Sequence, residues 1–219
     1  MLNHQLISNH IVPLQLNQTV EEALTSMDNL EIHQLPVVDE GIYQGLLEEE
    51  DLLDANSKQI IKELAFEFHP FSVRSDEHIS DAVNLSAGHD LELIPVVDAE
   101  KKYLGSITQE DLFRQHARIN GAGDQGALIV LEADPSQVSF GELSRLVETN
   151  DAQITQLNTY KDEVTGKTII TIRLNKKEVS DIVATFQRYE YHVLYFFGKE
   201  DYENELAHNY RHLLNYLEI

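Results

Sequence analysis

The sequence predicts an α+β protein in which two copies of a β-α-β-β-α repeat precede a β-α-β-β-α-β unit and a C-terminal helix. Three observations support this prediction. A segment of the first half occurs twice at a nearly constant offset, a glycine-rich break follows at residues 120–126, and residues 199–219 carry apolar side chains at helical spacing. Periodicities of two and of 3.6 residues then indicate the strands and helices.

The internal repeat is clearest around two Pro-Val-Val-Asp segments. Pro36-Val-Val-Asp39 recurs as Pro95-Val-Val-Asp98, an offset of 59 residues, and Gly45 recurs as Gly105, an offset of 60. A register that is kept over some 30 positions, with one residue added in a loop, indicates a duplication.

Each copy follows the same order of elements. The predicted elements of copy one are a strand at 12–16, a helix from Thr19, strands at 35–38 and 43–47, and a second helix from about Glu49. In copy two the first strand lies at 71–74 and the second helix starts near Gln109. The first helix opens with Thr19-x-x-Glu22, a capping-box pattern that satisfies free backbone N–H groups.

The Pro-Val-Val-Asp segment, followed by a strand that ends in Gly-x-x-Thr-x-x-Asp, resembles the CBS domain, whose tandem pairs form a compact disc. The resemblance covers residues 1–118, with copy one at 1–62 and copy two at 63–118. In copy two, Gly105-Ser-Ile-Thr-Gln-Glu-Asp111 matches the nucleotide-binding signature of that family in full.

The resemblance implies that Asp111 holds ribose hydroxyls and Thr108 hydrogen-bonds a phosphate of an adenosine ligand such as AMP, ADP, ATP or S-adenosylmethionine. A carboxylate accepts from a vicinal diol, and a hydroxyl beside helix N–H groups suits a phosphate oxygen. The spacing Thr108-x-x-Asp111 also describes an ordinary helix N-cap, which needs no ligand. Both interpretations stay open.

Copy one departs from the signature, because Glu48 stands where Thr is expected and a carboxylate repels phosphate. It retains Asp51, and His33 stands where some nucleotide-binding relatives carry a His-Arg pair. Arg74 is the nearest plausible cation for a phosphate. We therefore expect a weakly charged adenosine compound rather than a triphosphate, with copy two as the better site. The acidic run at 48–51 complements a helix dipole better than it suits a metal.

The second half begins after a predicted linker at residues 119–126. Strands are predicted at 127–131, 152–160, 167–174 and 192–197, and helices at 140–149 and 177–188. This order is ferredoxin-like, and residues 127–198 resemble an ACT domain. The resemblance implies pairing of domains and the binding of a small effector near Gly141. We expect residues 199–219 to form an amphipathic helix that docks on its own or a partner subunit.

Composition excludes several classes of protein. Sixteen Lys and Arg stand against 38 Asp and Glu, a net charge of −22, which disfavours nucleic acid and anionic membranes as partners. The absence of cysteine, of a signal peptide and of a long apolar run favours the cytoplasm. No nucleophile–base arrangement, Walker motif or dinucleotide motif is present, so we expect no enzyme activity.

A CBS pair followed by an ACT-like domain resembles bacterial regulators of the acetoin-utilisation type. That resemblance implies a ligand-sensing regulator, a homodimer that needs no cofactor and whose regulated partner the sequence does not identify. The alternative is a degenerate pair that binds no nucleotide and acts as a structural or protein-interaction module.

Overall fold

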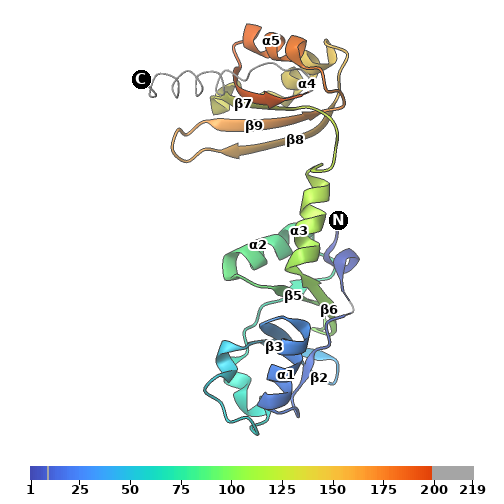
Figure 1. Cartoon of the computed structure of the whole chain (residues 1–219), viewed down its shortest axis with the longest axis vertical. Helices are drawn as coiled ribbons and strands as arrows, with labels where there is room; N and C mark the ends of the chain where they lie inside the picture. The colour runs from blue at the N-terminus through green and yellow to red at the C-terminus, as the bar shows by residue number, and fades with distance from the viewer. Residues whose placement is uncertain (9, 199–219) are drawn as a thin grey trace, which may run out of the picture. The chain divides into compact units, whose positions relative to one another are not determined.

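The computed structural model describes residues 1–8 and 10–198 (Figure 1). The described part of the chain divides into two compact units, one that ends at Ala117 and one that starts at Arg118. The predicted C-terminal helix at 199–219 lies outside the described residues. Within the described part of the chain, no helix is long and apolar enough to span a membrane.

The first unit contains the two copies of the repeat. The elements of copy one are β1 (Leu14–Gln15), α1 (Val20–Leu30), β2 (Gln34–Asp39), β3 (Ile42–Glu48) and the short 3-10 helix η2 (Glu50–Leu52). Those of copy two are β4 (Val73–Arg74), α2 (Ile79–His89), β5 (Leu93–Val97), β6 (Tyr103–Thr108) and α3 (Gln109–Ile119). The 3-10 helices η1 (Asn3–Leu6) and η3 (Ile61–Glu67) precede the two copies.

The two copies have the same sheet topology. In copy one, β1 pairs parallel with β2 and β2 pairs antiparallel with β3, and β4, β5 and β6 repeat this arrangement. Val37 lies opposite Gly45 and Val96 lies opposite Gly105, each pair followed by a β-bulge. The duplication predicted from the sequence is therefore confirmed in the fold.

Helix α1 begins at the predicted capping box. The N–H of Glu22 donates to Oγ1 of Thr19 at 3.3 Å, and the N–H of Thr19 donates to Oε2 of Glu22 at 2.7 Å. These two bonds satisfy backbone groups that the first turn of a helix leaves free. Val20, Ala23 and Met27 on the inner face of the helix are buried.

The prediction of a second helix in copy one from about Glu49 is wrong. Copy one has only the single 3-10 turn η2, whereas copy two has the eleven-residue helix α3. The chain after η2 is rich in residues that favour turns, and Oδ1 of Asn56 accepts the N–H of Lys58 at 3.0 Å. Such side-chain bonds to the local backbone compete with helix formation.

The first strands of both copies are also shorter than the predicted ranges 12–16 and 71–74. Pro13 directly precedes β1 and has no N–H to donate to a neighbouring strand, which limits extension of that ladder.

A connecting segment lies along the last strand of each copy. Before copy two, His69 and Leu46 exchange two backbone hydrogen bonds, both of 2.8 Å. In the other copy, the N–H of Ser8 donates to the carbonyl of Ser106 at 2.8 Å. The N-terminal segment therefore packs on copy two in the way that the linker between the copies packs on copy one.

The two signature glycines allow this close approach. A Cβ atom at Gly45 would lie 2.7 Å from Cβ of Phe68, and one at Gly105 would lie 2.3 Å from Cγ2 of Ile7. Both distances are shorter than carbon atoms tolerate. The glycine of the Gly-x-x-Thr-x-x-Asp pattern is therefore required by the fold in each copy.

The two copies meet through equivalent residues. The N–H of Tyr43 donates to the carbonyl of Lys101, and the N–H of Tyr103 donates to the carbonyl of Gly41, both at 2.9 Å. The copies also share a core, because Leu91 of copy two is buried in the cluster formed mainly by copy one. The pair therefore forms one compact unit.

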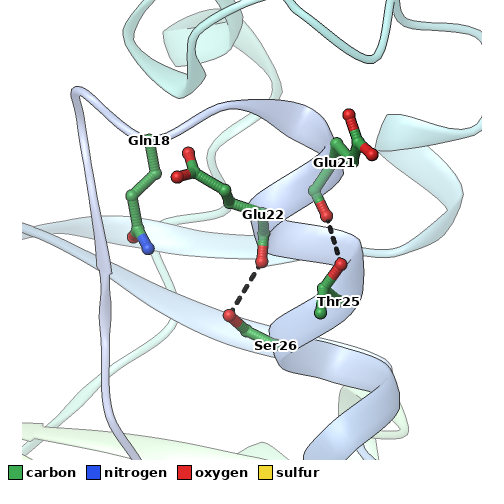
Figure 2. Close-up of a pocket in the computed structure, with 5 residues that line it drawn as sticks. All are labelled: Gln18, Glu21, Glu22, Thr25 and Ser26. Carbon is green, nitrogen blue, oxygen red and sulfur yellow. Dashed lines mark hydrogen bonds between the residues drawn. The ribbon is translucent and has the colours of Figure 1, made fainter.

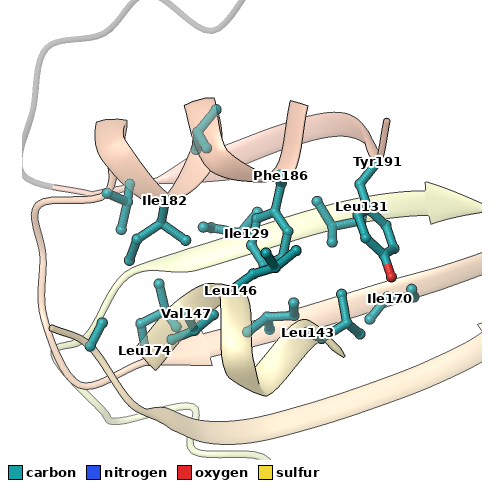
Figure 3. Packing of buried hydrophobic residues seen from close by; sticks show 14 of the residues in the cluster. Ile129, Leu131, Leu143, Leu146, Val147, Ile170, Leu174, Ile182, Phe186 and Tyr191 are labelled. Carbon is teal, nitrogen blue, oxygen red and sulfur yellow. The ribbon is translucent and has the colours of Figure 1, made fainter. Parts of the chain in front are cut away.

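The second unit has the predicted ferredoxin-like order of elements. They are β7 (Leu128–Ala133), the 3-10 helix η4 (Pro135–Gln137), α4 (Phe140–Glu148), β8 (Ile154–Lys161), β9 (Thr168–Leu174), α5 (Ser180–Arg188) and β10 (His192–Phe197). The antiparallel sheet has the strand order β10-β7-β9-β8. Both helices cover one face, where Ile129, Leu146 and Phe186 lie at the centre of a buried core (Figure 3).

Candidate functional site

The predicted pair Thr108 and Asp111 lies where β6 passes into α3. Oγ1 of Thr108 donates to Oδ2 of Asp111 at 2.9 Å and accepts the N–H of Asp111 at 3.1 Å. The two side chains thus form the N-cap that their spacing allows. Nη1 of Arg114 lies 4.0 Å from Oδ1 of Asp111, and 39% of the Asp111 side chain is exposed. This carboxylate is therefore accessible to solvent and is already held in one orientation.

The equivalent carboxylate in copy one, Asp51, is more enclosed. Its Oδ2 atom accepts the N–H of Glu48 at 3.1 Å and lies 3.4 Å from Nε2 of His69. Only 18% of the Asp51 side chain is exposed. Sequence reasoning did not single out His69, because its contact with Asp51 depends on how the linker between the copies packs.

His33 bridges the two copies. Its N–H donates to Oε2 of Glu92 at 2.8 Å, and its Nδ1 lies 2.9 Å from Oε1 of the same carboxylate. The hydrogen bond to Glu92, followed by charge attraction from Glu92 and Glu49, raises the pKa of His33. His33 and Glu92 occupy equivalent positions of the repeat, 59 residues apart, so the contact joins one copy to the other at a matched point.

Gln34 is a second bridging residue that the sequence did not identify. Its Nε2 atom donates to Oε1 of Glu48 at 3.2 Å, and its Oε1 atom accepts the N–H of Glu92 at 3.1 Å. The side chain is buried and polar, so these bonds satisfy groups that would otherwise be costly to bury. Gln34 therefore fixes the spacing of the two copies beside Glu48.

Arg74 is engaged by its own neighbour. Its Nε donates to Oδ1 of Asp76 at 3.0 Å and its Nη2 donates to Oδ2 at 2.8 Å, a bidentate pair. This pairing raises the pKa of Arg74 and lowers that of Asp76. Among the described contacts, none joins Arg74 to Thr108 or Asp111, so the structure does not bring the predicted cation into the site.

Carboxylates dominate the surroundings of the start of α3. The carbonyl of Glu92 accepts the N–H of Gln109 at 2.7 Å, which places Glu92 beside the helix start. Glu110 follows directly and forms an ion pair with Arg114. A phosphate here would face more negative than positive charge, whereas an uncharged or cationic ligand would not be repelled. In the described part of the chain, no cluster of three or more His, Cys, Asp or Glu side chains could hold a metal ion.

One surface hollow of the first unit lies along α1, away from the predicted residues. It is lined by Gln18, Glu21, Glu22, Thr25 and Ser26 (Figure 2). The hydroxyls of Thr25 and Ser26 donate to the carbonyls of Glu21 and Glu22 within the helix, and the Glu22 side chain caps Thr19. Three of its five lining side chains, those of Glu22, Thr25 and Ser26, thus bond to the backbone of the helix or its cap.

In the second unit, Gly141 lies in the first turn of α4. A Cβ atom there would meet no atom within 4 Å, so neither packing nor a left-handed backbone requires a glycine. A surface hollow lies at the opposite end of β7, where Nζ of Lys177 donates to Oε1 of Gln125 at 3.4 Å. The structure therefore does not bring Gly141 together with that hollow.

Comparison with protein families identifies the first unit. The sequence model of the CBS domain matches residues 4–58 and 61–118, more than half of the chain. The chain belongs to the CBS domain family. Its two copies are a tandem CBS pair, and the signature residues Thr108 and Asp111 lie in the second CBS domain.

Relatives of known sequence share this pair. A CBS domain-containing protein of Dictyostelium discoideum is 26% identical over 128 residues, which is 51% of this chain and 88% of that protein. An inosine-5'-monophosphate dehydrogenase of Methanocaldococcus jannaschii is 23% identical over 145 residues, 66% of this chain but only 29% of the enzyme. The matched stretch is therefore most of the first relative and less than a third of the second.

A solved structure supports the fold of the CBS pair. A CBS domain pair/ACT domain protein of Thermotoga maritima is similar to this chain with a TM-score of 0.51 and 23% identity. The match covers 54% of this chain and 98% of that one. At this identity the likeness concerns the fold alone.

Proposed function

We propose that this CBS protein is a regulatory sensor whose second CBS domain binds an adenosine-containing ligand at Thr108 and Asp111. The observation that carries the proposal is the complete signature on a pre-oriented helix start. Asp111 is held by the Thr108 hydroxyl, yet 39% of its side chain is exposed. A fixed carboxylate of this kind suits a ribose diol, which offers two hydroxyl donors.

The ligand class follows from the charges. Glu92 and Glu110 adjoin the helix start, and the guanidinium of Arg74 is occupied by Asp76. Binding of a triphosphate would place like charges close together in a partly dehydrated site. Adenosine itself, or the positively charged S-adenosylmethionine, avoids this repulsion and is the favoured ligand.

The second unit extends the proposal. A ferredoxin-like domain after a CBS pair is the order of acetoin-utilisation-type regulators, which supports pairing of two chains through this ACT-like domain. Binding of a small effector near Gly141 stays a prediction, since a Cβ atom there would meet no atom within 4 Å and the space beside this glycine is open. We also propose that the chain acts without enzyme activity, and that its regulated partner is a protein.

A second candidate function is a CBS pair that binds no nucleotide and serves as a rigid interaction module. The contacts of His33 and Gln34 with Glu92 favour it, because they tie the copies together without a ligand. Glu48 in place of the signature threonine favours it as well.

Replacement of Asp111 tests the proposal. Asp111→Asn keeps the shape of the side chain but removes the charge that strengthens its bonds to ribose hydroxyls. Hydrogen bonds to charged groups contribute about 1.5–3 kcal/mol, so affinity for adenosine or S-adenosylmethionine should fall about tenfold or more in titration calorimetry.

The matched control is Asp81→Asn, which removes a carboxylate from the first turn of α2 in the same copy. It should bind like the wild type. Equal affinity of the Asp111 variant and the wild type would remove Asp111 from the site. If none of the three proteins binds either ligand, the interaction module is the better interpretation.

A further inference from the structure

The signature carboxylate of copy one is engaged by the chain itself. Oδ2 of Asp51 accepts the N–H of Glu48 at 3.1 Å and faces Nε2 of His69 at 3.4 Å. Asp111 in copy two has instead the Thr108 hydroxyl, with the Arg114 guanidinium at 4.0 Å. The two equivalent carboxylates thus have different neighbours, and His69 of the connecting segment is one of those of Asp51.

His69 is held firmly in this place. Its backbone N–H and carbonyl both bond to Leu46, at 2.8 Å each, so the residue is fixed along β3. Its ring stacks on that of Phe71, with centroids 5.7 Å apart and planes inclined by 4°. The imidazole is therefore oriented by the fold, and its contact with Asp51 does not depend on a freely rotating side chain.

Copy two has a serine at the position equivalent to His69. Ser8 pairs with Ser106 as His69 pairs with Leu46, and the preceding residues Ile7 and Phe68 cover the two signature glycines. A serine side chain ends one bond beyond Cβ, whereas the imidazole of histidine extends several bonds further. This exchange, together with Glu48 in place of a threonine, accounts for the different surroundings of the two carboxylates.

We propose that His69 closes the ribose position of copy one, so that the CBS pair binds one ligand, at copy two. The inference rests on the proposed function. A ribose diol binds a carboxylate by donating to its oxygens, and in copy one the Glu48 N–H and the His69 imidazole already approach Oδ2 of Asp51. A ligand in copy one would have to displace an imidazole that the backbone and Phe71 hold in place.

Exchange of the two equivalent residues tests the inference. Adenosine serves as the probe, because it carries no phosphate for Glu48 to repel. Titration calorimetry on the full chain should give one equivalent of adenosine for the wild type and two for His69→Ser. Ser8→His should introduce the blocking side chain into copy two and reduce binding to none.

His69→Asn is a second variant, with a shorter side chain than histidine, in case the serine variant does not fold. A wild type that binds two equivalents, or folded His69 variants that gain none, would overturn the inference. The proposed function fails separately, namely if the wild type binds no adenosine. If His69→Ser then binds one equivalent, that result would support the closure of copy one by His69 and contradict a site in copy two.

Discussion

At the scale of single residues, contacts across the repeat decide which signature groups remain accessible. His33 and Glu92 are equivalent in sequence, yet one carries an imidazole and the other a carboxylate, so they attract each other where the copies meet. The family resemblance implied that His33 is one of the ligand-binding residues. The structure shows its imidazole bonded to Glu92, with 68% of its side chain exposed.

The sequence also predicted the N-cap formed by Thr108 and Asp111, and the departure of copy one from the signature at Glu48. It could not predict the roles of Gln34 and His69. Both depend on contacts between residues far apart in the chain, Gln34 with Glu92 and His69 with Asp51. A local pattern such as Thr108-x-x-Asp111 can be found in sequence, because both partners lie in one helical turn.

The raised pKa of His33 predicts a specific dependence of stability on pH. A group whose pKa is higher in the folded than in the unfolded state stabilises fully below its unfolded pKa, and loses this contribution as pH rises through the folded pKa. The ordinary value is 6.5, so the contribution disappears as pH rises above about that value.

Melting temperatures of the wild type and His33→Gln between about pH 5.5 and 8.5 test this. The wild type should be the more stable protein at the acidic end, and the difference should shrink toward pH 8.5. Glu92→Gln removes the partner of His33, so its melting temperature should depend on pH in the same way as that of His33→Gln. A difference that does not change with pH would contradict the pairing of His33 with Glu92.

At the scale of elements, the sequence predicted the order of strands and helices but not every length. The second helix of copy one is only the short 3-10 helix η2, because turn-forming residues follow Leu52. The corresponding segment of copy two forms the longer helix α3. In this stretch the local preferences of the two copies differ, so a repeat in sequence did not guarantee a repeat in helix length.

The connecting segments show a second role for the signature glycines. Gly105 has a φ of +139°, which other residues rarely adopt, and a Cβ atom there would meet Ile7. Gly105→Ala should therefore lower stability by about 1–3 kcal/mol, as overpacking does in well-packed cores. Denaturant unfolding of the full chain measures this loss.

Gly88→Ala is the matched control. Gly88 lies in α2, and a Cβ atom there would meet no atom within 4 Å. Alanine has the higher helix propensity, by up to about 1 kcal/mol, so this variant should be as stable as the wild type or more so. A Gly105→Ala protein of undiminished stability would contradict the close packing of the N-terminal segment on β6.

At the scale of the whole molecule, two units with separate cores carry different sequence patterns. The first is a duplicated CBS pair with a shared core, and the second is a ferredoxin-like sheet covered on one face by α4 and α5. Both fold types could be predicted because repeats and strand–helix order are visible in the sequence. The ligand could not be predicted, because the Thr108-x-x-Asp111 pattern is typical both of a helix N-cap and of a ribose-binding site.

Binding of an adenosine ligand is tested by the melting temperature of the wild type with adenosine, S-adenosylmethionine, AMP and ATP. A ligand that binds only the folded state adds about 2.7 kcal/mol of stability at a hundredfold excess over its Kd. We expect the melting temperature to rise by several degrees with adenosine or S-adenosylmethionine, and by less with ATP. No rise with any of the four at millimolar concentration would contradict a sensor of adenosine ligands.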